Sequence, residues 1–209
     1  MFDALFTTTT EYKKLSHALS GKGACALFGL PASGRAQVYA ALCRQLDKPL
    51  CIVTPGEAEA TRFAADLNTL GIPAAVFPAR DYVLRPIEGT AREYEYRRLA
   101  VLGELVGGRL RAVAVPAEAL TQFTTPKEDF CANTRTLHAG DTLLRDDLLA
   151  ALFGAGYTRR AQVDGPGQFS VRGDIVDIFA PDQKMPVRME FWGDEIDTLH
   201  TFDLTTQRR

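Results

Sequence analysis

Short apolar runs alternate with longer amphipathic segments through the first half of the chain. The apolar runs are four or five residues long, and the segments between them repeat apolar residues at helical spacing. The pattern predicts strands at residues 24–28, 50–53, 74–77 and 112–115, and helices at residues 36–46, 57–70 and 92–105. Strands that alternate with helices are typical of a parallel sheet covered by helices on both faces. The first half is therefore expected to be an α/β domain.

The pattern changes near residue 117, where strand-like segments begin to follow one another closely. A short helix at 116–123, a strand start at 136–137 and a helix at 145–153 come first. The strands then expected are residues 158–163, 168–172, 175–179, 187–192 and 196–202. Tight glycine-containing turns between them predict an antiparallel sheet. We therefore expect an α/β domain over residues 1–117 and a smaller α+β domain over residues 118–204.

Composition narrows the class of protein. Hydrophobic residues make up 46% of the chain and charged residues 24%, which is typical of a folded domain and not of a disordered or membrane-spanning one. A net charge of −2 does not fit a strongly basic nucleic-acid-binding domain. The four cysteines form no CxxC pair, so we expect no metal site, no disulfide framework and a cytoplasmic location. Cys25 and Cys51 fall on predicted core strands.

A degenerate phosphate loop follows the first predicted strand. Gly29 and Gly34 stand at the spacing of the Walker A loop, G-x-x-x-x-G-K-[ST], with Ser33 before the second glycine. Arg35 replaces the lysine that would neutralise phosphate, and Ala36 replaces the hydroxyl that would ligate magnesium. Phosphoryl transfer depends on that metal ion. Three interpretations stay open: an ordinary glycine turn, an inactive remnant of an NTPase loop, and an active ATPase.

Two further patterns each have a structural explanation beside a functional one. Residues 194–197 read DEID, like a helicase DExD box, but they follow a turn glycine in the antiparallel half, which predicts a solvated hairpin. The segment from Arg80 to Arg111 interleaves arginines with tyrosines, a mixture that can bind single-stranded DNA. Interspersed aspartates and glutamates favour a salt-bridged helix surface there instead.

The second half also carries a specific run of motifs. Residues 167–179 read GQFSVRGDIVDIF, and residues 187–197 read VRMEFWGDEID. Together with Gly156-Tyr157-Thr158-Arg159 and residues 77–81, they closely resemble the module shared by the excision-repair protein UvrB and the N-terminal region of the transcription-repair coupling factor Mfd. The degenerate loop at residues 29–36, and a segment at 81–92 too short for the DNA-clamping hairpin of UvrB, favour the coupling-factor family.

The resemblance implies a truncated, degenerate P-loop scaffold followed by a domain that docks UvrA. It assigns UvrA contact to Arg159 and Arg172, with Arg160, Phe169 and Ser170 beside them, and Ser170 stands where UvrB has a further arginine. It implies no catalytic residue, metal or cofactor in this fragment, because ATP and magnesium are used by the motor domains of the parent. RNA polymerase and DNA would bind domains outside the fragment, and residues 205–209 would begin a return to the first domain.

In that family, C-terminal domains of the parent chain are thought to mask the docking face. Strand alternation fits the assignment, because it places Ser170 and Arg172 on one face and Phe169 and Val171 on the other. The alternative to a docking role is that these arginines are solvated side chains on a sheet and bind no partner. The alternative in another class is an enzyme, either a weak P-loop ATPase or a UvrB-like DNA-damage loader in which Arg35 binds phosphate.

Overall fold

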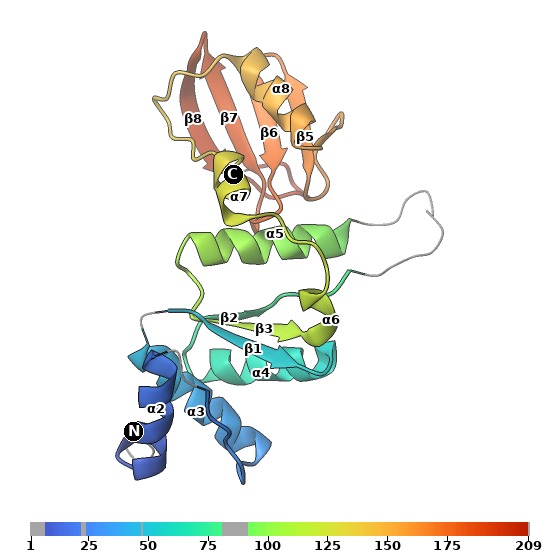
Figure 1. The fold of residues 1–209 in the computed structure, drawn as a ribbon. Coiled ribbons are helices and arrows are strands. Elements are labelled where there is room, and N and C mark those ends of the chain that lie inside the picture. The colour runs from blue at the N-terminus through green and yellow to red at the C-terminus, as the bar shows by residue number, and fades with distance from the viewer. Residues whose placement is uncertain (1–6, 22–23, 47, 81–91, 209) are drawn as a thin grey trace. The chain divides into compact units, whose positions relative to one another are not determined.

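The computed structural model describes residues 7–21, 24–46, 48–80 and 92–208, which fall into two compact units (Figure 1). The first unit takes residues up to Thr90 and Val101–Phe123, and the second takes Ala91–Ala100 and Thr124–Arg209. Helix α5 (Glu93–Val106) therefore contributes its first part to the second unit and its last part to the first. The boundary expected at residue 117 lies at the start of α6 (Ala117–Leu120), and the domain ranges stay a prediction.

A parallel sheet organises the described part of the first unit. Its strands are β1 (Leu50–Thr54), β2 (Ala74–Val76) and β3 (Ala112–Pro116), in the order β1-β3-β2. The middle strand, β3, is buried along its length because helices cover both of its faces. Helix α4 (Glu57–Thr69) packs Phe63 and Leu67 against Ala112 and Ala114, and Val101 of α5 packs against Val113 on the opposite face. The predicted α/β class is confirmed.

Two helices precede the sheet along the chain. Helix α2 (Thr10–Ser20) begins after Thr9, whose side chain accepts a hydrogen bond from the Tyr12 amide at 3.2 Å. Tyr12 packs against Val38 and Leu42 of α3 (Ala32–Gln45). The cap at Thr9 is the sequence signal for α2, which the analysis of apolar periodicity did not identify.

The expected strand at residues 24–28 is wrong. These residues have no regular secondary structure and are exposed, with Phe28 at 88% of its full exposure. An apolar run becomes a strand only where another strand completes its hydrogen bonds, and none of the described strands pairs with it. Cys25 is exposed for this reason. Cys51 does lie on β1, but it is also exposed, since alternate residues of this edge strand face away from the core.

The second unit contains a five-stranded sheet with one helix packed on it. In the described residues its strands are β4 (Thr158–Arg159), β5 (Gln168–Arg172), β6 (Ile175–Phe179), β7 (Val187–Trp192) and β8 (Glu195–Thr201), in sequential order. Leu148 and Leu152 of α8 (Arg145–Gly154) pack against Phe169, Val176 and Met189 on one face of the sheet. The face away from α8 carries Ser170, Asp177 and Arg188, and we call it the open face. Phe202 and Gln207 lie against it beside Arg188, whose Nη1 donates to the Gln207 carbonyl at 3.4 Å. The predicted antiparallel α+β architecture is confirmed for β5 to β8.

Several details of the second half differ from the expectation. The strand expected at 158–163 is reduced to two residues, and it runs parallel to β5 because the intervening loop returns the chain to its starting side. No strand forms at residues 136–137, and the helix expected at 116–123 ends at Leu120. A short helix, α7 (Lys127–Ala132), buries none of its side chains and so leaves no periodic pattern. Asp194 lies in the β7–β8 turn, which confirms the hairpin interpretation of residues 194–197.

Two cysteines provide a test of the first unit. Cys25 is exposed, whereas Cys43 is buried in α3, where its Sγ donates to the Arg111 carbonyl at 3.4 Å and burial raises its thiol pKa. Because the thiolate is the reactive form, a thiol-alkylating reagent should modify Cys25 in the folded chain and leave Cys43 unmodified until urea unfolds it. Peptide mapping by mass spectrometry measures both. Protection of Cys25 in the folded chain would mean that residues 24–28 are a buried strand after all.

Candidate functional site

The residues of the predicted phosphate loop lie mostly within a helix. Helix α3 begins at Ala32, so Ser33, Gly34, Arg35 and Ala36 belong to its first turns. The Arg35 amide donates to the Pro31 carbonyl at 3.0 Å, which is a helical hydrogen bond. A Walker A loop instead turns successive backbone amides toward phosphate. Gly29, with φ of +82°, is the position before the helix that requires a glycine backbone.

The two side chains that replace the Walker A lysine and hydroxyl are both used within the first unit. Arg35 Nη1 lies 3.7 Å from Glu59 Oε1 on α4, and its guanidinium lies 5.8 Å from the centre of the Phe63 ring. Ala36 is 2% exposed and packs in the core between α3 and α4. Arg35 therefore joins two helices, and Ala36 occupies a position where a larger polar side chain would have to be buried.

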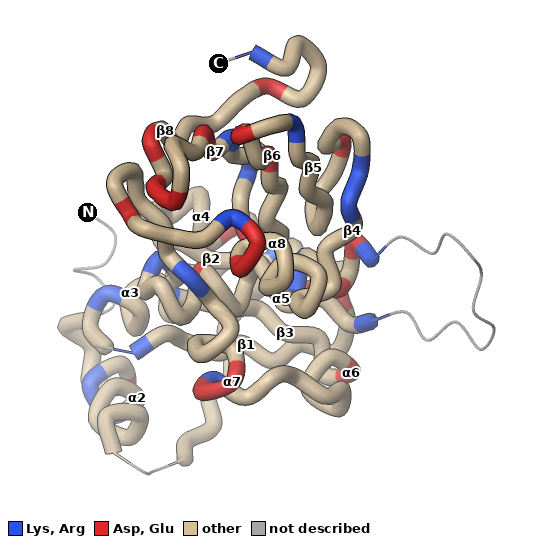
Figure 2. The backbone as a smooth tube through the Cα atoms, turned by 90° about the horizontal axis from the view of Figure 1, so that it is seen from above, with Lys and Arg blue, Asp and Glu red and all other residues tan. Residues whose placement is uncertain are grey.

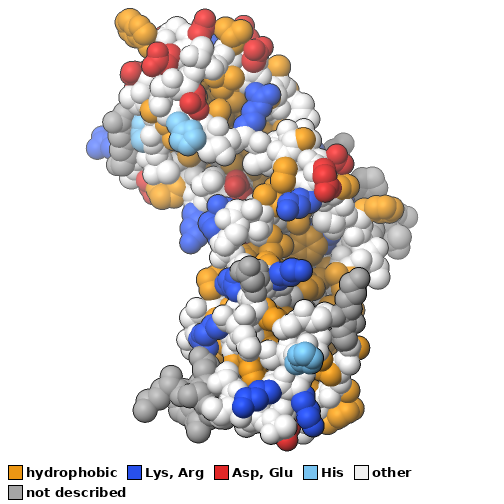
Figure 3. Space-filling model, turned by 60° about the vertical axis from the view of Figure 1, so that its left-hand side comes forward, with side chains coloured by type: hydrophobic (Ala, Val, Ile, Leu, Met, Phe, Trp, Pro, Cys, Tyr) orange, Lys and Arg blue, Asp and Glu red, His pale blue; other side chains and the backbone are white. Residues whose placement is uncertain are grey.

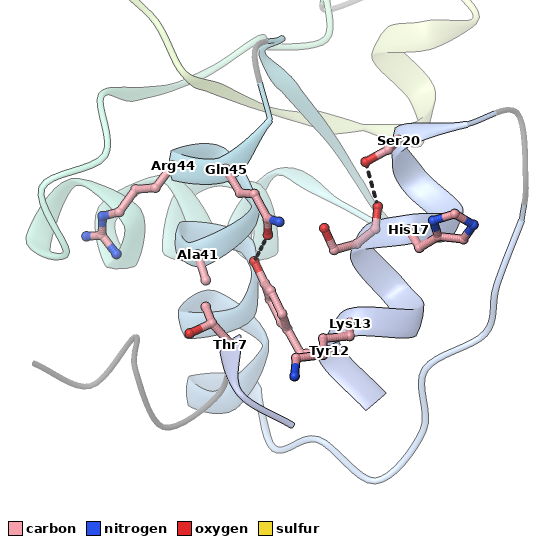
Figure 4. A pocket seen from close by; sticks show the side chains of 9 residues that line it. Thr7, Tyr12, Lys13, His17, Ser20, Ala41, Arg44 and Gln45 are labelled. Carbon is pink, nitrogen blue, oxygen red and sulfur yellow. Dashed lines mark hydrogen bonds between the residues drawn. The ribbon is translucent and has the colours of Figure 1, made fainter. Parts of the chain in front are cut away.

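The first unit also has a cavity of about 640 Å³ between α2 and α3, which the sequence analysis did not predict (Figure 4). One hydrogen bond links its walls, from Tyr12 Oη on α2 to Gln45 Oε1 on α3 at 3.0 Å, and a second, from Ser20 Oγ to the Ser16 carbonyl at 2.8 Å, lies within α2. Arg44 points away from α2 and donates to the Leu70 carbonyl. The basic side chains of this cavity therefore do not converge on one point.

On the open face of the second sheet, a buried carboxylate holds two arginines. Asp177 lies in the middle of β6, is fully buried, and pairs across the ladder with Ser170 on β5 and Arg188 on β7. Arg172 Nη2 donates to Asp177 Oδ2 at 2.6 Å. Arg188 donates from Nε to Oδ1 at 2.7 Å and from Nη2 to Oδ2 at 2.9 Å. We refer to Arg172, Asp177 and Arg188 as the open-face cluster.

The two arginines of this cluster have different surroundings. The Arg188 side chain is 16% exposed, its guanidinium lies 4.5 Å from the centre of the Phe202 ring, and its hydrogen bonds to Asp177 raise its already high pKa. The Arg172 side chain is 47% exposed, although one end of its fork is bound to Asp177. Arg188 is therefore a structural partner of Asp177, while Arg172 presents the rest of its guanidinium to solvent.

The three predicted docking arginines do not share one face. Arg159 pairs in parallel register with Phe169, so it lies on the α8 side of the sheet, at the β4 edge. Arg160 follows β4 and lines a separate cavity of about 660 Å³ with Tyr96 and Gln168. Figure 2 shows basic positions of the chain beside β4 at this edge. The structure therefore places Arg172 on the open face and Arg159 on the opposite side.

Phe169 and Ser170 are not available for direct contact with a partner. Phe169 is fully buried and meets the Phe153 ring edge-on, with 5.1 Å between ring centres. Ser170 is 1% exposed, and its Oγ lies 3.5 Å from Asp177 Oδ2. The expectation that Phe169 packs inward is confirmed, but the prediction that both residues belong to the docking surface is wrong, because Phe169 is buried against α8 and Ser170 is buried beside Asp177.

The arginine- and tyrosine-rich segment is partly outside the described residues, which leave out Tyr82 and Arg85. Its described arginines serve the fold: Arg98 is 3% exposed and donates to Thr124 Oγ1, and Arg109 pairs with Glu104 at 2.9 Å. On the surface seen in Figure 3, basic side chains stand apart among polar and apolar ones. The ion pair between Arg109 and Glu104 is a contact of the kind that the salt-bridged interpretation predicts.

Comparison with known proteins identifies the second unit. The UvrB interaction domain matches residues 136–209. A transcription-repair-coupling factor of Mycobacterium bovis is 38% identical over 186 residues, and one of Bacillus subtilis is 29% identical over 184 residues; these matches cover 85% and 87% of this chain. The UvrABC system protein B of Chlorobium limicola is 28% identical over 193 residues, 85% of this chain and 28% of its own length. The chain contains a UvrB-homology module.

The homology module is a small part of its relatives. The chain spans 15% of the length of the M. bovis factor and 16% of the length of the B. subtilis factor. The matched interaction domain includes the whole five-stranded sheet and the open-face cluster. The resemblance read from the motifs at residues 167–179 and 187–197 is therefore confirmed.

Sequence reasoning missed three residues of the module's open face. Asp177 and Arg188 complete the cluster around Arg172, and Trp192 stands 82% exposed on the same face of β7. A signal for Asp177 was present, because the Gly173-Asp174 turn pairs Arg172 with Ile175 and therefore Ser170 with Asp177. Arg188 could not be found in this way, since the long connection between β6 and β7 leaves their register open.

The described residues of the module contain no group of three or more histidine, cysteine, aspartate or glutamate side chains arranged to hold a metal ion. Among the same residues, no helix combines the length and apolar character needed to cross a membrane.

Tyr157, which precedes β4 and packs in the α8 core, provides a pH test of the module. Burial, with smaller effects from Asp182 and Tyr96, raises its pKa to about 12. The unfolded chain ionises this tyrosine near pH 10, so the contribution of neutral, buried Tyr157 to the stability of the second unit is fully present below that pH and is lost as pH rises from about 10 to about 12. The Tyr157→Phe variant should lose less stability over this interval than the wild type in urea unfolding. Identical pH dependence in the two proteins would contradict the assignment.

Proposed function

We propose that this chain is the part of a transcription-repair-coupling factor that recruits UvrA, and that it does so through the open face of its second unit. The proposal rests on the geometry of Arg172. This arginine lies at the end of β5, its side chain is half-exposed, and its guanidinium is held by a hydrogen bond to Asp177. The match to the UvrB interaction domain supports the second unit as the docking unit, because residues 136–209 include its whole sheet.

The chemistry of Arg172 favours an acidic partner surface. A guanidinium binds a carboxylate through two parallel N–H···O bonds and is more weakly hydrated than a lysine ammonium. Since Arg172 uses Nη2 for Asp177, its other nitrogens remain on the exposed side for a second carboxylate. We therefore propose that Arg172 pairs with an aspartate or glutamate of UvrA, and that Trp192 adds apolar contact area on the same face.

Arg159 and Arg160 have a smaller part than Arg172 in the proposed interface with UvrA. Both are exposed, but β4 places Arg159 at the sheet edge on the α8 side and Arg160 beside a separate cavity. A partner seated on the open face would meet Arg172 directly, and would reach Arg159 only by extending around the β4 edge. We therefore propose Arg172 as the principal contact and Arg159 as a peripheral one.

We propose that the first unit is a non-catalytic scaffold that needs no nucleotide or metal. Three observations support this: α3 begins before the position of the Walker A lysine, Arg35 faces Glu59, and Ala36 is buried. RNA polymerase, DNA and the masking C-terminal domains of a longer parent chain stay predictions of the resemblance, because the chain spans only 15% of the M. bovis relative.

Replacement of Arg172 tests the docking proposal. Arg172→Ala should weaken UvrA binding by about 2 kcal/mol or more, roughly 30-fold, which is the cost of truncating a central interface arginine. Isothermal titration calorimetry or surface plasmon resonance with purified UvrA measures the change. Arg109→Ala is the matched control, because it removes an equally exposed arginine that pairs with Glu104 in the first unit. Wild-type affinity in a folded Arg172→Ala protein would refute the proposal.

A nucleotide titration separates the scaffold from the alternative enzyme. The chain should show no binding of fluorescent ATP with magnesium at micromolar concentrations, because the lysine and metal-binding hydroxyl of the loop are absent. Fluorescence anisotropy measures this, with an intact Walker A protein such as UvrB as the positive control. Saturable micromolar binding that is lost in Arg35→Ala would instead support the weak ATPase.

A further inference from the structure

We propose that Asp177 is a positioning residue for partner docking: its buried carboxylate holds the Arg172 guanidinium in the orientation that receives UvrA. This inference rests on the proposed function and names a residue beneath the docking surface rather than on it. The carboxylate itself cannot touch a partner, because Asp177 is fully buried. Its effect on binding would therefore pass through Arg172.

The geometry of the open-face cluster shows that Asp177 does not need Arg172 for charge balance. Arg188 already forms two hydrogen bonds to the carboxylate, one to each oxygen, at 2.7 and 2.9 Å. This bidentate contact neutralises the buried charge within the sheet. The Glu190 carboxylate, on the same face of β7, also attracts the Arg188 guanidinium electrostatically. The Arg188–Asp177 pair thus already balances the charge of the buried carboxylate. The bond from Arg172 is additional to that pair.

The additional bond restricts a side chain that would otherwise be mobile. Arg172 is at the end of β5, beside the Gly173-Asp174 turn, where nearly half of its side chain is exposed. Its 2.6 Å bond to Asp177 anchors one end of the guanidinium before any partner arrives, and so restricts the orientations that the side chain can take. Ordering a long interface side chain during binding costs about 0.5–1.5 kcal/mol. Loss of the bond should therefore weaken partner binding about 2- to 12-fold.

The direction of the change in UvrA affinity distinguishes positioning of Arg172 by Asp177 from a simple effect of charge. Removing a carboxylate makes the open face more positive, which would strengthen binding of an acidic partner. Positioning requires the opposite result, because the free guanidinium must be ordered on binding. Asp174 provides the matched control: it is an exposed aspartate in the adjacent turn, and it pairs with Arg145 at 3.3 Å rather than with Arg172. Asp174→Asn removes the same charge without releasing Arg172.

The first measurement needs no partner. In the free chain, ¹⁵N relaxation of the Arg172 Nε–Hε group should indicate an ordered side chain in the wild type and in Asp174→Asn, and a mobile one in Asp177→Asn. Equal order in Asp177→Asn and the wild type would overturn the positioning claim. Because UvrA is absent, this result stands whether or not the proposed function is correct.

The second measurement is a double-mutant cycle on UvrA affinity. Asp177→Asn should weaken binding about 2- to 12-fold in the wild-type background and have no further effect in the Arg172→Ala background. A loss of the same size in both backgrounds would overturn the proposal, since Asp177 would then act on the whole face. Wild-type affinity of Arg172→Ala would refute the proposed function and the docking role of Asp177, while the relaxation result would still decide whether Asp177 orders Arg172.

A second variant covers the case in which Asp177→Asn does not fold, which circular dichroism would detect. Arg172→Lys leaves the Asp177–Arg188 pair intact and keeps the positive charge, but a single ammonium bound to Asp177 cannot present a planar fork to a second carboxylate. It should bind UvrA nearly as weakly as Arg172→Ala. Wild-type affinity of Arg172→Lys would overturn the proposal, because an oriented guanidinium would then be unnecessary.

Discussion

The buried Asp177 carboxylate is the interaction on which the second unit depends. It accepts hydrogen bonds from Arg172 on β5 and Arg188 on β7, so one charged group in β6 joins three neighbouring strands. A buried charge is strongly destabilising when it loses its partner, which makes this cluster sensitive to register. A shift by one residue would turn Asp177 into the apolar layer against α8. Arg188 forms two of the hydrogen bonds to the carboxylate, and the additional bond from Arg172 holds one end of a half-exposed guanidinium.

In the first unit, two positions of the predicted phosphate loop take part in packing between helices. Its parallel sheet and the helix that follows the glycine motif are present, but Arg35 faces Glu59 and Ala36 lies in the core between α3 and α4. These two positions contribute to contacts between α3 and α4. This packing is what the proposed scaffold role of the first unit requires.

Sequence patterns predicted the elements that carry their own signal. Helix α4 has an apolar face, α8 has two aspartates in its first turn, and the strands from β5 to β8 are separated by turns such as Gly173-Asp174. Patterns failed where an element depends on a distant partner. Residues 24–28 are as apolar as a strand but have no strand beside them among the described residues, and β4 runs parallel to β5 because of the course of the loop between them.

By itself, the sequence determined the two fold classes, the loss of the Walker A lysine and hydroxyl, and the resemblance to UvrB and the coupling factors. Alternation along β5 also placed Arg172 opposite Phe169. Only the tertiary structure decided that Arg172 and Arg188 share the Asp177 carboxylate, that Ser170 is covered, and that Arg159 lies on the other side of the sheet. The physical reason is register: the faces of a strand follow from its own residues, whereas its neighbours follow from pairings between segments far apart in the chain.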